Sequence, residues 1–159
     1  MAIRIGNGYD SHRFEEGKPL MLGGVPIPHH AGLKGHSDGD ALLHAIIDAL
    51  FGAVADGDIG AHFPDTDPKW EGADSARLLA MTGERLRELG YSVVNIDATV
   101  VAQEPKLRPH VDAMRARIAE VLALPVDCVS VKGKTNEGMD AVGHHEGIVV
   151  YASVLVQTL

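Results

Sequence analysis

Cysteine is nearly absent from this 159-residue chain, which contains only Cys128. An intrachain disulfide is therefore excluded, and a reducing compartment fits the sequence. Cys128 stands in an apolar segment, where we expect it to be a small apolar residue at the start of a strand. The N-terminal residues show no signal-peptide pattern. We therefore expect a cytoplasmic protein, or one in the stroma of a compartment if a transit peptide was removed.

Aromatic residues are also scarce, at 4% of the chain, whereas apolar residues make up 45%. The core must therefore consist mainly of Ala, Val, Leu and Ile, and an apolar content this high argues against a disordered chain. No apolar run is long enough to cross a bilayer. A chain of this length suits one domain with a sizeable core, so we expect a single domain over residues 1–159.

Positive charge is in deficit, because 14 Lys and Arg stand against 22 Asp and Glu, for a formal net charge of −8 at pH 7. Sequence-independent binding to nucleic acid or to anionic membranes needs a positive field, so we expect neither partner. An anionic small molecule is still compatible with this composition, because a few local cations or a metal ion can hold a phosphate.

The segment 35–52 is the most informative stretch, and it predicts an apolar helix opened by a polar cluster. Its apolar run is interrupted only by His44 and Asp48. A helix that is apolar on nearly all sides lies in a core or an interface. Asp40, His44 and Asp48 share one face of this helix because they are spaced four residues apart. Buried polar side chains need a partner, and a metal ion is one candidate.

Asp10 and His12, at the end of a strand predicted over residues 3–10, offer two further metal ligands. Residues two apart in an extended segment point the same way. With His44 they supply one carboxylate and two imidazoles, and three protein ligands with an open fourth position are usual for catalytic zinc. Spacing alone leaves open that His44 is an ordinary hydrogen-bonded core histidine. Asp48, one turn beyond His44, is a candidate hydrogen-bond partner for its ring.

Two further segments carry side chains suited to phosphates and sugars. His36 and Ser37 precede the predicted helix, whose N-terminal amides could hold an anion; simple capping by Ser37 is the alternative. Residues 53–70 are rich in Asp, Gly and Pro. They are too polar for a core and too long for a tight connection, so we expect a functional loop, with a solvated acidic loop as the alternative. No nucleophile triad and no P-loop are recognisable.

The rest of the pattern predicts an α+β two-layer sandwich. We expect a hairpin over 20–27, helices over 74–89 and 110–124, and strands over 91–103, 129–134 and 148–156. The last strand is apolar on both faces and should be fully buried. These elements suggest a mixed sheet of roughly four strands with three helices on one face. The uncovered face would be too apolar for water, which indicates an oligomer.

Motifs along the whole chain carry a resemblance to a known family. They are GYDSH at 8–12, GGV at 23–25, GHSDGD at 35–40, His44, DA at 48–49, GDIG at 57–60, FPDTD at 63–67, GADS at 72–75, QEPK at 103–106, TNE at 135–137 and EG at 146–147. With these motifs the chain resembles the 2-C-methyl-D-erythritol 2,4-cyclodiphosphate synthase family. The HSDGD and DIG…FPDTDP blocks in this order are highly specific.

The resemblance implies a homotrimer with the sheets facing the centre and active sites between subunits. It implies a phosphorus–oxygen lyase of non-mevalonate isoprenoid precursor biosynthesis. The substrate would be 4-diphosphocytidyl-2-C-methyl-D-erythritol 2-phosphate, and the products 2-C-methyl-D-erythritol 2,4-cyclodiphosphate and CMP. The nucleophile would be the substrate's own 2-phosphate, mostly dianionic at neutral pH, so no strong base is needed. A zinc-dependent phosphohydrolase and a non-catalytic cytidine-nucleotide-binding trimer are the alternatives.

The resemblance also implies roles for individual residues. The metal ligands would be Asp10, His12 and His44 for zinc or another divalent transition metal, and Glu137 for magnesium or manganese. His36 and Thr135 would act in catalysis by stabilising the transition state. The substrate-binding residues would be Asp10, Ser11, His12, His36, Ser37, Asp58, Ile59, Gly60, Phe63, Pro64, Asp65, Thr66, Asp67, Ala102, Gln103, Glu104, Pro105, Lys106, Leu107, Arg108, Lys134, Thr135, Asn136 and Glu137.

Ala141 and His144 depart from the family pattern. They stand where relatives often have an aromatic residue and an arginine, near the trimer axis. Those positions are linked to an isoprenoid diphosphate, so the sequence does not predict that ligand here.

Overall fold

A mixed five-stranded sheet in the order β4-β1-β7-β5-β6 forms one layer of the computed structural model, which describes residues 1–159. Its strands are β1 (Ile3–Glu16), β4 (Ala31–Leu33), β5 (Tyr91–Val101), β6 (Val129–Lys134) and β7 (Gly147–Thr158). Only β5 and β6 pair in parallel. The sequence predicted one strand fewer, because β4 has three residues and is too short to show alternation. The predicted hairpin is a separate pair, β2 (Leu20–Leu22) and β3 (Val25–Ile27).

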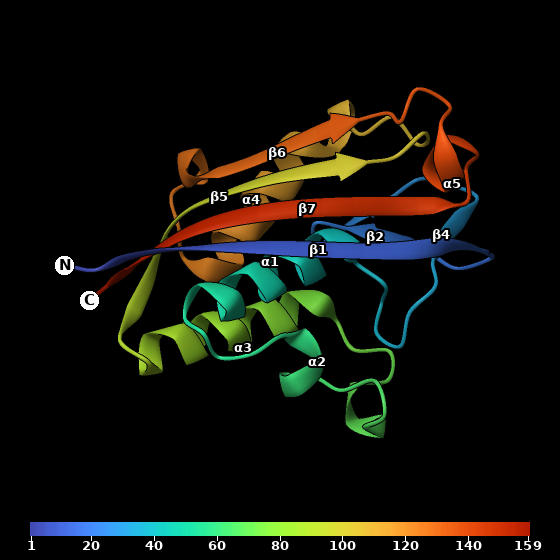
Figure 1. Cartoon of the computed structure of the whole chain (residues 1–159). Helices are drawn as coiled ribbons and strands as arrows, with labels where there is room; N and C mark the ends of the chain where they lie inside the picture. The colour runs from blue at the N-terminus through green and yellow to red at the C-terminus, as the bar shows by residue number, and fades with distance from the viewer.

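Three longer helices form the second layer on one face of the sheet (Figure 1). They are α1 (Ala41–Ala53), α3 (Ser75–Glu88) and α4 (Val111–Leu122). The shorter elements are α2 (Ile59–His62), α5 (Asp140–Gly143) and the 3-10 turns η1 (Pro68–Trp70), η2 (Arg108–His110) and η3 (Val126–Cys128). The helical layer is therefore as the sequence predicted. None of the helices has the length and hydropathy that a membrane span requires.

Helix α1 lies directly against β1 because two glycines of that strand leave room for it. A Cβ atom at Gly8 would lie 1.8 Å from the carbonyl oxygen of Ala45, and one at Gly6 would lie 1.9 Å from that of Ala49. Nearly all of α1 is buried, as its apolar sequence predicted. This close approach sets the first turns of α1 beside the side chains that β1 directs toward the helices.

The other face of the sheet is uncovered in the single chain. Ile3, Ile5, Tyr9 and Tyr151 are 61%, 69%, 56% and 54% exposed. The prediction that the last strand is fully buried is therefore wrong for the single chain, because alternate residues of β7 lie on this face. The face is mixed rather than wholly apolar, since Lys132 also forms an ion pair with Asp97 on it.

Candidate active site

Asp10, His12 and His44 converge where α1 crosses β1. Oδ2 of Asp10 lies 2.8 Å from Nε2 of His12 and 3.2 Å from Nδ1 of His44, and the two ring nitrogens are 3.3 Å apart. Among all His, Cys, Asp and Glu side chains, these form the only group of three whose ligand atoms lie within 4.8 Å of one another. The expected convergence of strand and helix ligands is confirmed.

The hydrogen bonds around this triad suit a divalent cation. Nδ1 of His12 lies 2.5 Å from the carbonyl oxygen of Lys34. A carbonyl only accepts, so Nδ1 carries the hydrogen, and Nε2 of the neutral ring presents a lone pair toward Asp10. Nδ1 of His44 faces the same point, while its Nε2 contacts the hydroxyls of Ser37 and Ser75 at 3.0 and 2.8 Å. One carboxylate oxygen and two imidazole nitrogens thus meet as a donor set that suits zinc or a similar metal.

The charge state of the triad also favours a bound cation. Burial alone would raise the pKa of the Asp10 carboxyl, but the hydrogen bonds and charges of His12 and His44 outweigh burial and lower it to about 2. At His12, burial lowers the pKa while the Asp10 carboxylate raises it, and the net result lies above the ordinary 6.5. Asp10 is therefore ionised at neutral pH, and its negative charge is available to a metal ion.

Asp48 does not support the ring of His44, so that prediction was wrong. Oδ1 of Asp48 accepts a hydrogen bond from the backbone N–H of Ile59 at 3.0 Å. The ring of His44 contacts Asp10, His12, Ser37 and Ser75 instead. Spacing of four residues places two side chains on the same side of a helix, but tertiary contacts decide which groups they reach.

A pocket of about 430 Å³ opens beside the triad and gathers many of the predicted substrate-binding residues. Its lining residues are Asp10, His12, Lys34, Gly35, His36, Ser37, His44, Ile59, Gly60, Phe63, Pro64, Asp65, Trp70 and Leu78. Sequence reasoning did not place Lys34, Gly35, Trp70 or Leu78 in the site. The position of Lys34 just before the HSDGD block was the only signal that could have suggested it.

The loop between α1 and α3 is held against this pocket by its own caps and by His36. Nε2 of His36 donates to the carbonyl oxygen of Asp67 at 3.1 Å. Asp58 caps α2 by accepting from Ala61 N–H at 2.8 Å, and Asp67 caps η1 by accepting from Lys69 N–H at 2.9 Å. Asp58, Thr66 and Asp67 therefore flank the pocket along the chain without lining it.

The HSDGD block forms hydrogen bonds to two distant motifs, GGV at 23–25 and GADS at 72–75. Asp40 is fully buried and accepts from the backbone N–H groups of Gly23, Gly24 and Leu43. Asp38 accepts from both the backbone N–H and the hydroxyl of Ser75. Asp40, rather than Ser37, is thus the N-cap of α1. Together the two carboxylates connect the β2–β3 hairpin and the start of α3 to the end of α1 that carries His44.

A second pocket of about 420 Å³ lies at the carboxyl ends of the parallel strands β5 and β6, where α/β proteins commonly bind ligands. Its lining residues are Ala102, Gln103, Pro105, Lys106, Leu107, Arg108, Val111, Val131, Lys132, Gly133, Lys134 and Thr135. It holds most of the substrate-binding residues predicted over 102–108, and several cations. It shares no lining residue with the first pocket. The single chain therefore does not bring His36 and Thr135 into one pocket.

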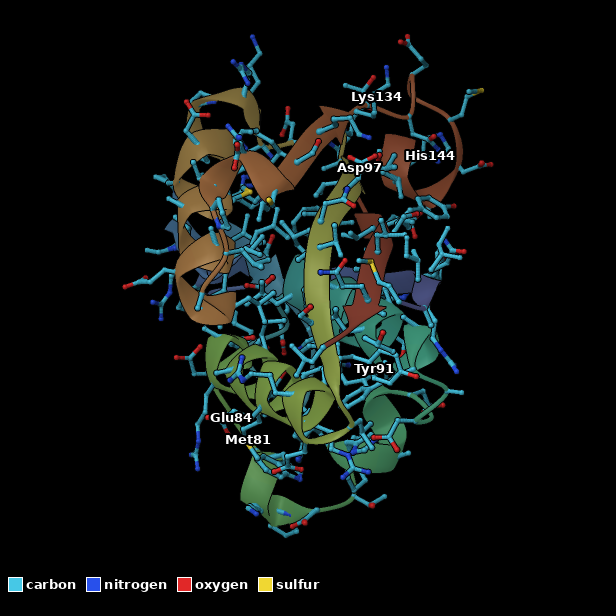
Figure 2. The ribbon with its side chains drawn as sticks, turned by 90° about the vertical axis from the view of Figure 1, so that its left-hand side faces the viewer. Met81, Glu84, Tyr91, Asp97, Lys134 and His144 are labelled. Carbon is cyan, nitrogen blue, oxygen red and sulfur yellow. The ribbon has the colours of Figure 1, made fainter.

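Besides Asp58, Thr66 and Asp67, four more of the predicted residues lie outside both pockets. Ser11 stands between Asp10 and His12 on β1, so its side chain lies on the opposite face of the sheet. Glu104 faces His145, with 3.8 Å between its carboxylate and Nδ1. Asn136 donates to the carbonyl oxygen of Met139, and Glu137 is exposed with a φ of 51°. Glu137 joins no group of three metal ligands, so a magnesium ion there stays a prediction. Figure 2 shows Lys134 and His144 toward the same end of the molecule, and Tyr91 toward the other.

Comparison with known proteins places the chain in a family. The family model described as YgbB family matches residues 3–157. A protein of Salinibacter ruber named 2-C-methyl-D-erythritol 2,4-cyclodiphosphate synthase is 57% identical over 156 residues, which cover 98% of this chain and 99% of that protein. The chain belongs to the YgbB family, that of the 2-C-methyl-D-erythritol 2,4-cyclodiphosphate synthases.

Solved structures of the family have the same fold. A 2C-methyl-D-erythritol-2,4-cyclodiphosphate synthase in its CDP-bound form is 40% identical, with a TM-score of 0.89 over 97% of this chain and 100% of that one. The bifunctional IspDF from Campylobacter jejuni is 44% identical, with a TM-score of 0.96 over 99% of this chain. The chain spans only 43% of that bifunctional protein.

Proposed function

We propose that this protein converts 4-diphosphocytidyl-2-C-methyl-D-erythritol 2-phosphate to 2-C-methyl-D-erythritol 2,4-cyclodiphosphate and CMP, as a lyase of non-mevalonate isoprenoid precursor biosynthesis. The observation that carries the proposal is the 57% identity over 99% of the length of a protein with this synthase name. The converging side chains of Asp10, His12 and His44 agree with it chemically. We further propose the cytoplasm as its location, which the single free thiol of Cys128 suits.

The reaction needs charge neutralisation and alignment more than it needs a strong base. An oxygen of the 2-phosphate forms a bond to the β-phosphorus, the bond from that phosphorus to the bridging oxygen breaks, and CMP leaves with the electron pair. Both reacting groups are anionic, so the protein must hold them together in line. A divalent metal held by Asp10, His12 and His44 would neutralise charge and polarise a phosphate oxygen when bound.

His36 and Ser37 line the same pocket as the triad and suit the 2-phosphate. Because Nε2 of His36 donates to the Asp67 carbonyl, Nδ1 is the ring atom left for a ligand. Nδ1 can donate to a phosphate oxygen when the ring is an imidazolium. Ile59 and Gly60 of α2, with Phe63 just after it, supply the less polar wall that the erythritol carbons require.

The second pocket suits the cytidine end of the substrate. Its walls include the segment 102–108 except Glu104, and they carry the cations Lys106, Arg108 and Lys134. Backbone groups can recognise the edge of cytosine, and the cations suit the diphosphate. We propose that Thr135 acts on the transferred phosphoryl group and that Glu137 holds a magnesium or manganese ion beside the diphosphate.

We propose a homotrimer in which the metal pocket of one subunit faces the nucleotide pocket of its neighbour. Two observations support it. His36 and Thr135 line pockets with no residue in common, although the proposed reaction needs both groups on one phosphate. The uncovered sheet face also exposes Ile3, Ile5, Tyr9 and Tyr151, an apolar set that facing sheets at a trimer centre would bury.

The deciding experiment is incubation of the purified protein with the diphosphocytidyl substrate, zinc and magnesium, followed by ³¹P NMR. Formation of CMP together with the cyclic diphosphate is the expected result. CMP together with linear phosphates would identify a phosphohydrolase instead. Tight binding of CDP without turnover would identify a non-catalytic nucleotide-binding protein. Chelator-treated protein is the control, and it should regain activity when zinc is returned.

A further inference from the structure

Ser75 connects a metal-ligand histidine to a carboxylate outside the triad. It is fully buried at the start of α3. Its hydroxyl oxygen lies 2.8 Å from Nε2 of His44 and 2.5 Å from Oδ1 of Asp38. We propose that Ser75, anchored by Asp38, is a positioning residue that fixes the tautomer and orientation of His44, so that Nδ1 is presented to the metal. This inference rests on the proposed metal site.

The direction of each hydrogen bond follows from donor and acceptor chemistry. A carboxylate only accepts, so the Ser75 hydroxyl donates its single hydrogen to Asp38. Toward His44 the same oxygen can then only accept, and Nε2 must carry the ring hydrogen. The lone pair of the neutral ring is therefore on Nδ1, which faces Oδ2 of Asp10 at 3.2 Å and Nε2 of His12 at 3.3 Å. The ring enters the triad in the form that a metal requires.

The anchor is rigid because both oxygens of Asp38 are engaged by backbone groups as well. Oδ1 accepts from the N–H of Asp40, the N-cap of α1, and Oδ2 accepts from the N–H of Ser75, both at 3.0 Å. The carboxylate therefore lies at the junction of α1 and α3 and cannot turn without breaking these bonds. Replacing a partner of this kind, which orients a ligand histidine, commonly lowers metal affinity or activity by about 10- to 100-fold.

The same assignment frees the hydroxyl of Ser37 for the pocket. Oγ of Ser37 lies 3.0 Å from Nε2 of His44 and accepts weakly from the Gly39 N–H at 3.4 Å. Since Nε2 is a donor, it cannot accept the Ser37 hydroxyl hydrogen. That hydrogen can therefore be directed to a bound phosphate. Ser75 thus positions His44, whereas Ser37 is free to bind the ligand.

The test compares Ser75→Ala and Ser75→Thr with Thr82→Val. Thr82 is a matched control because it is fully buried on the same helix and its hydroxyl donates to the Leu78 carbonyl, away from His44. Zinc affinity is measured by competition with a chelating dye. The tautomer of His44 is measured in the metal-free protein by long-range ¹H–¹⁵N NMR. We expect Ser75→Ala to lower zinc affinity by about 10- to 100-fold and to abolish the single Nε2–H tautomer. Ser75→Thr and Thr82→Val should retain both.

An affinity within about twofold of wild type in Ser75→Ala, with an unchanged tautomer, would overturn the proposal. An equal loss of zinc affinity in Thr82→Val would overturn it too, because the removal of any buried hydroxyl from α3 would then have the same effect. Ser75→Cys fills the same space with a weaker acceptor and should lose affinity in the same direction, which keeps the test decisive if Ser75→Ala does not fold. If the wild-type protein binds no zinc, the proposed function fails. The tautomer measurement still tests whether Ser75 fixes the ring of His44, because it uses the metal-free protein.

Discussion

The carboxylate of Asp48 accepts a hydrogen bond from the backbone N–H of Ile59 at 3.0 Å. The helix that carries His44 therefore also holds the start of α2, whose residues Ile59 and Gly60 line the pocket beside the triad. The proposed metal ligand His44 and the pocket wall are thus attached to one buried helix. A change at Asp48 should therefore affect substrate binding without affecting metal binding.

Asp48→Ala should leave zinc affinity unchanged but loosen the pocket wall. The variant loses a hydrogen bond to a charged acceptor, which is worth about 1.5–3 kcal/mol of unfolding free energy. We expect a higher KM for the diphosphocytidyl substrate and full zinc stoichiometry. Steady-state kinetics and elemental analysis measure the two effects. Loss of zinc in this variant would contradict this account and would indicate that Asp48 supports His44 rather than Ile59.

His44→Ala should lose both zinc and activity and still assemble as a trimer. The substitution removes one of three ligands at the edge of α1, while the exposed sheet face that we assign to the trimer is untouched. Elemental analysis together with light scattering provides the measurement. A variant that keeps stoichiometric zinc would show that the ligand set is wrong.

As pH rises through the pKa of His12, the metal-free protein should lose stability while its affinity for zinc increases. The pKa of His12 is raised above 6.5 in the folded chain, so its contribution to stability is complete below 6.5 and is lost as pH rises through the higher value. The pKa of Asp10 falls from 3.8 to about 2, so its contribution is present above 3.8 and is lost as pH falls toward 2. Zinc needs the neutral His12 ring, so zinc affinity should rise with pH over the range in which the metal-free protein loses stability.

Thermal melts of the chelator-treated protein and zinc titrations at several pH values measure these two trends. Asp10→Asn is the control, since it removes the carboxylate that raises the pKa of His12. If the pH profile of Asp10→Asn melting matched that of the wild type, the triad would not be the source of the effect.

Gly8→Ala should be strongly destabilising. Its new Cβ atom would lie 1.8 Å from the carbonyl oxygen of Ala45, which belongs to helix backbone and cannot rotate away. Helix α1 would have to move off β1, at a cost of about 3 kcal/mol or more, and His44 would move away from Asp10. Gly52→Ala is the matched control, because its nearest neighbouring atom is 3.9 Å away and Ala is the better helix former. Denaturant unfolding measures both, and similar unfolding free energies for the two variants would contradict this account of the packing.

Co-expression of His36→Ala with Thr135→Ala should restore activity that neither variant has alone. If an active site takes His36 from one subunit and Thr135 from its neighbour, random mixing makes about a quarter of the sites fully wild type. In trimers purified to contain both variants, one of the three sites is fully wild type, so we expect about a third of wild-type kcat from them. No recovery in trimers shown to contain both variants would mean that one chain supplies both groups.

Several features of this protein follow from local sequence, because they depend on spacing within one element. Residues 10 and 12 point the same way on a strand, an apolar run predicts the buried helix α1, and glycine, aspartate and proline mark the loop that follows. The convergence of Asp10, His12 and His44 was therefore predictable. The family motifs are likewise local, because each is a contiguous run of residues.

Other features depend on groups that are far apart in the chain, and no local pattern encodes them. Ser75 meets His44 only because α3 packs beside α1, so sequence spacing suggested Asp48 instead. The exposure of Tyr151 follows from which face of β7 the helices cover, whereas its apolar neighbours suggested a strand buried on both faces. The separation of His36 from Thr135 likewise follows from the strand order, because His36 comes after β4 and Thr135 after β6, and these two strands are the opposite edges of the sheet. Packing between elements decides these contacts, because it selects one partner among several that the same local pattern would allow.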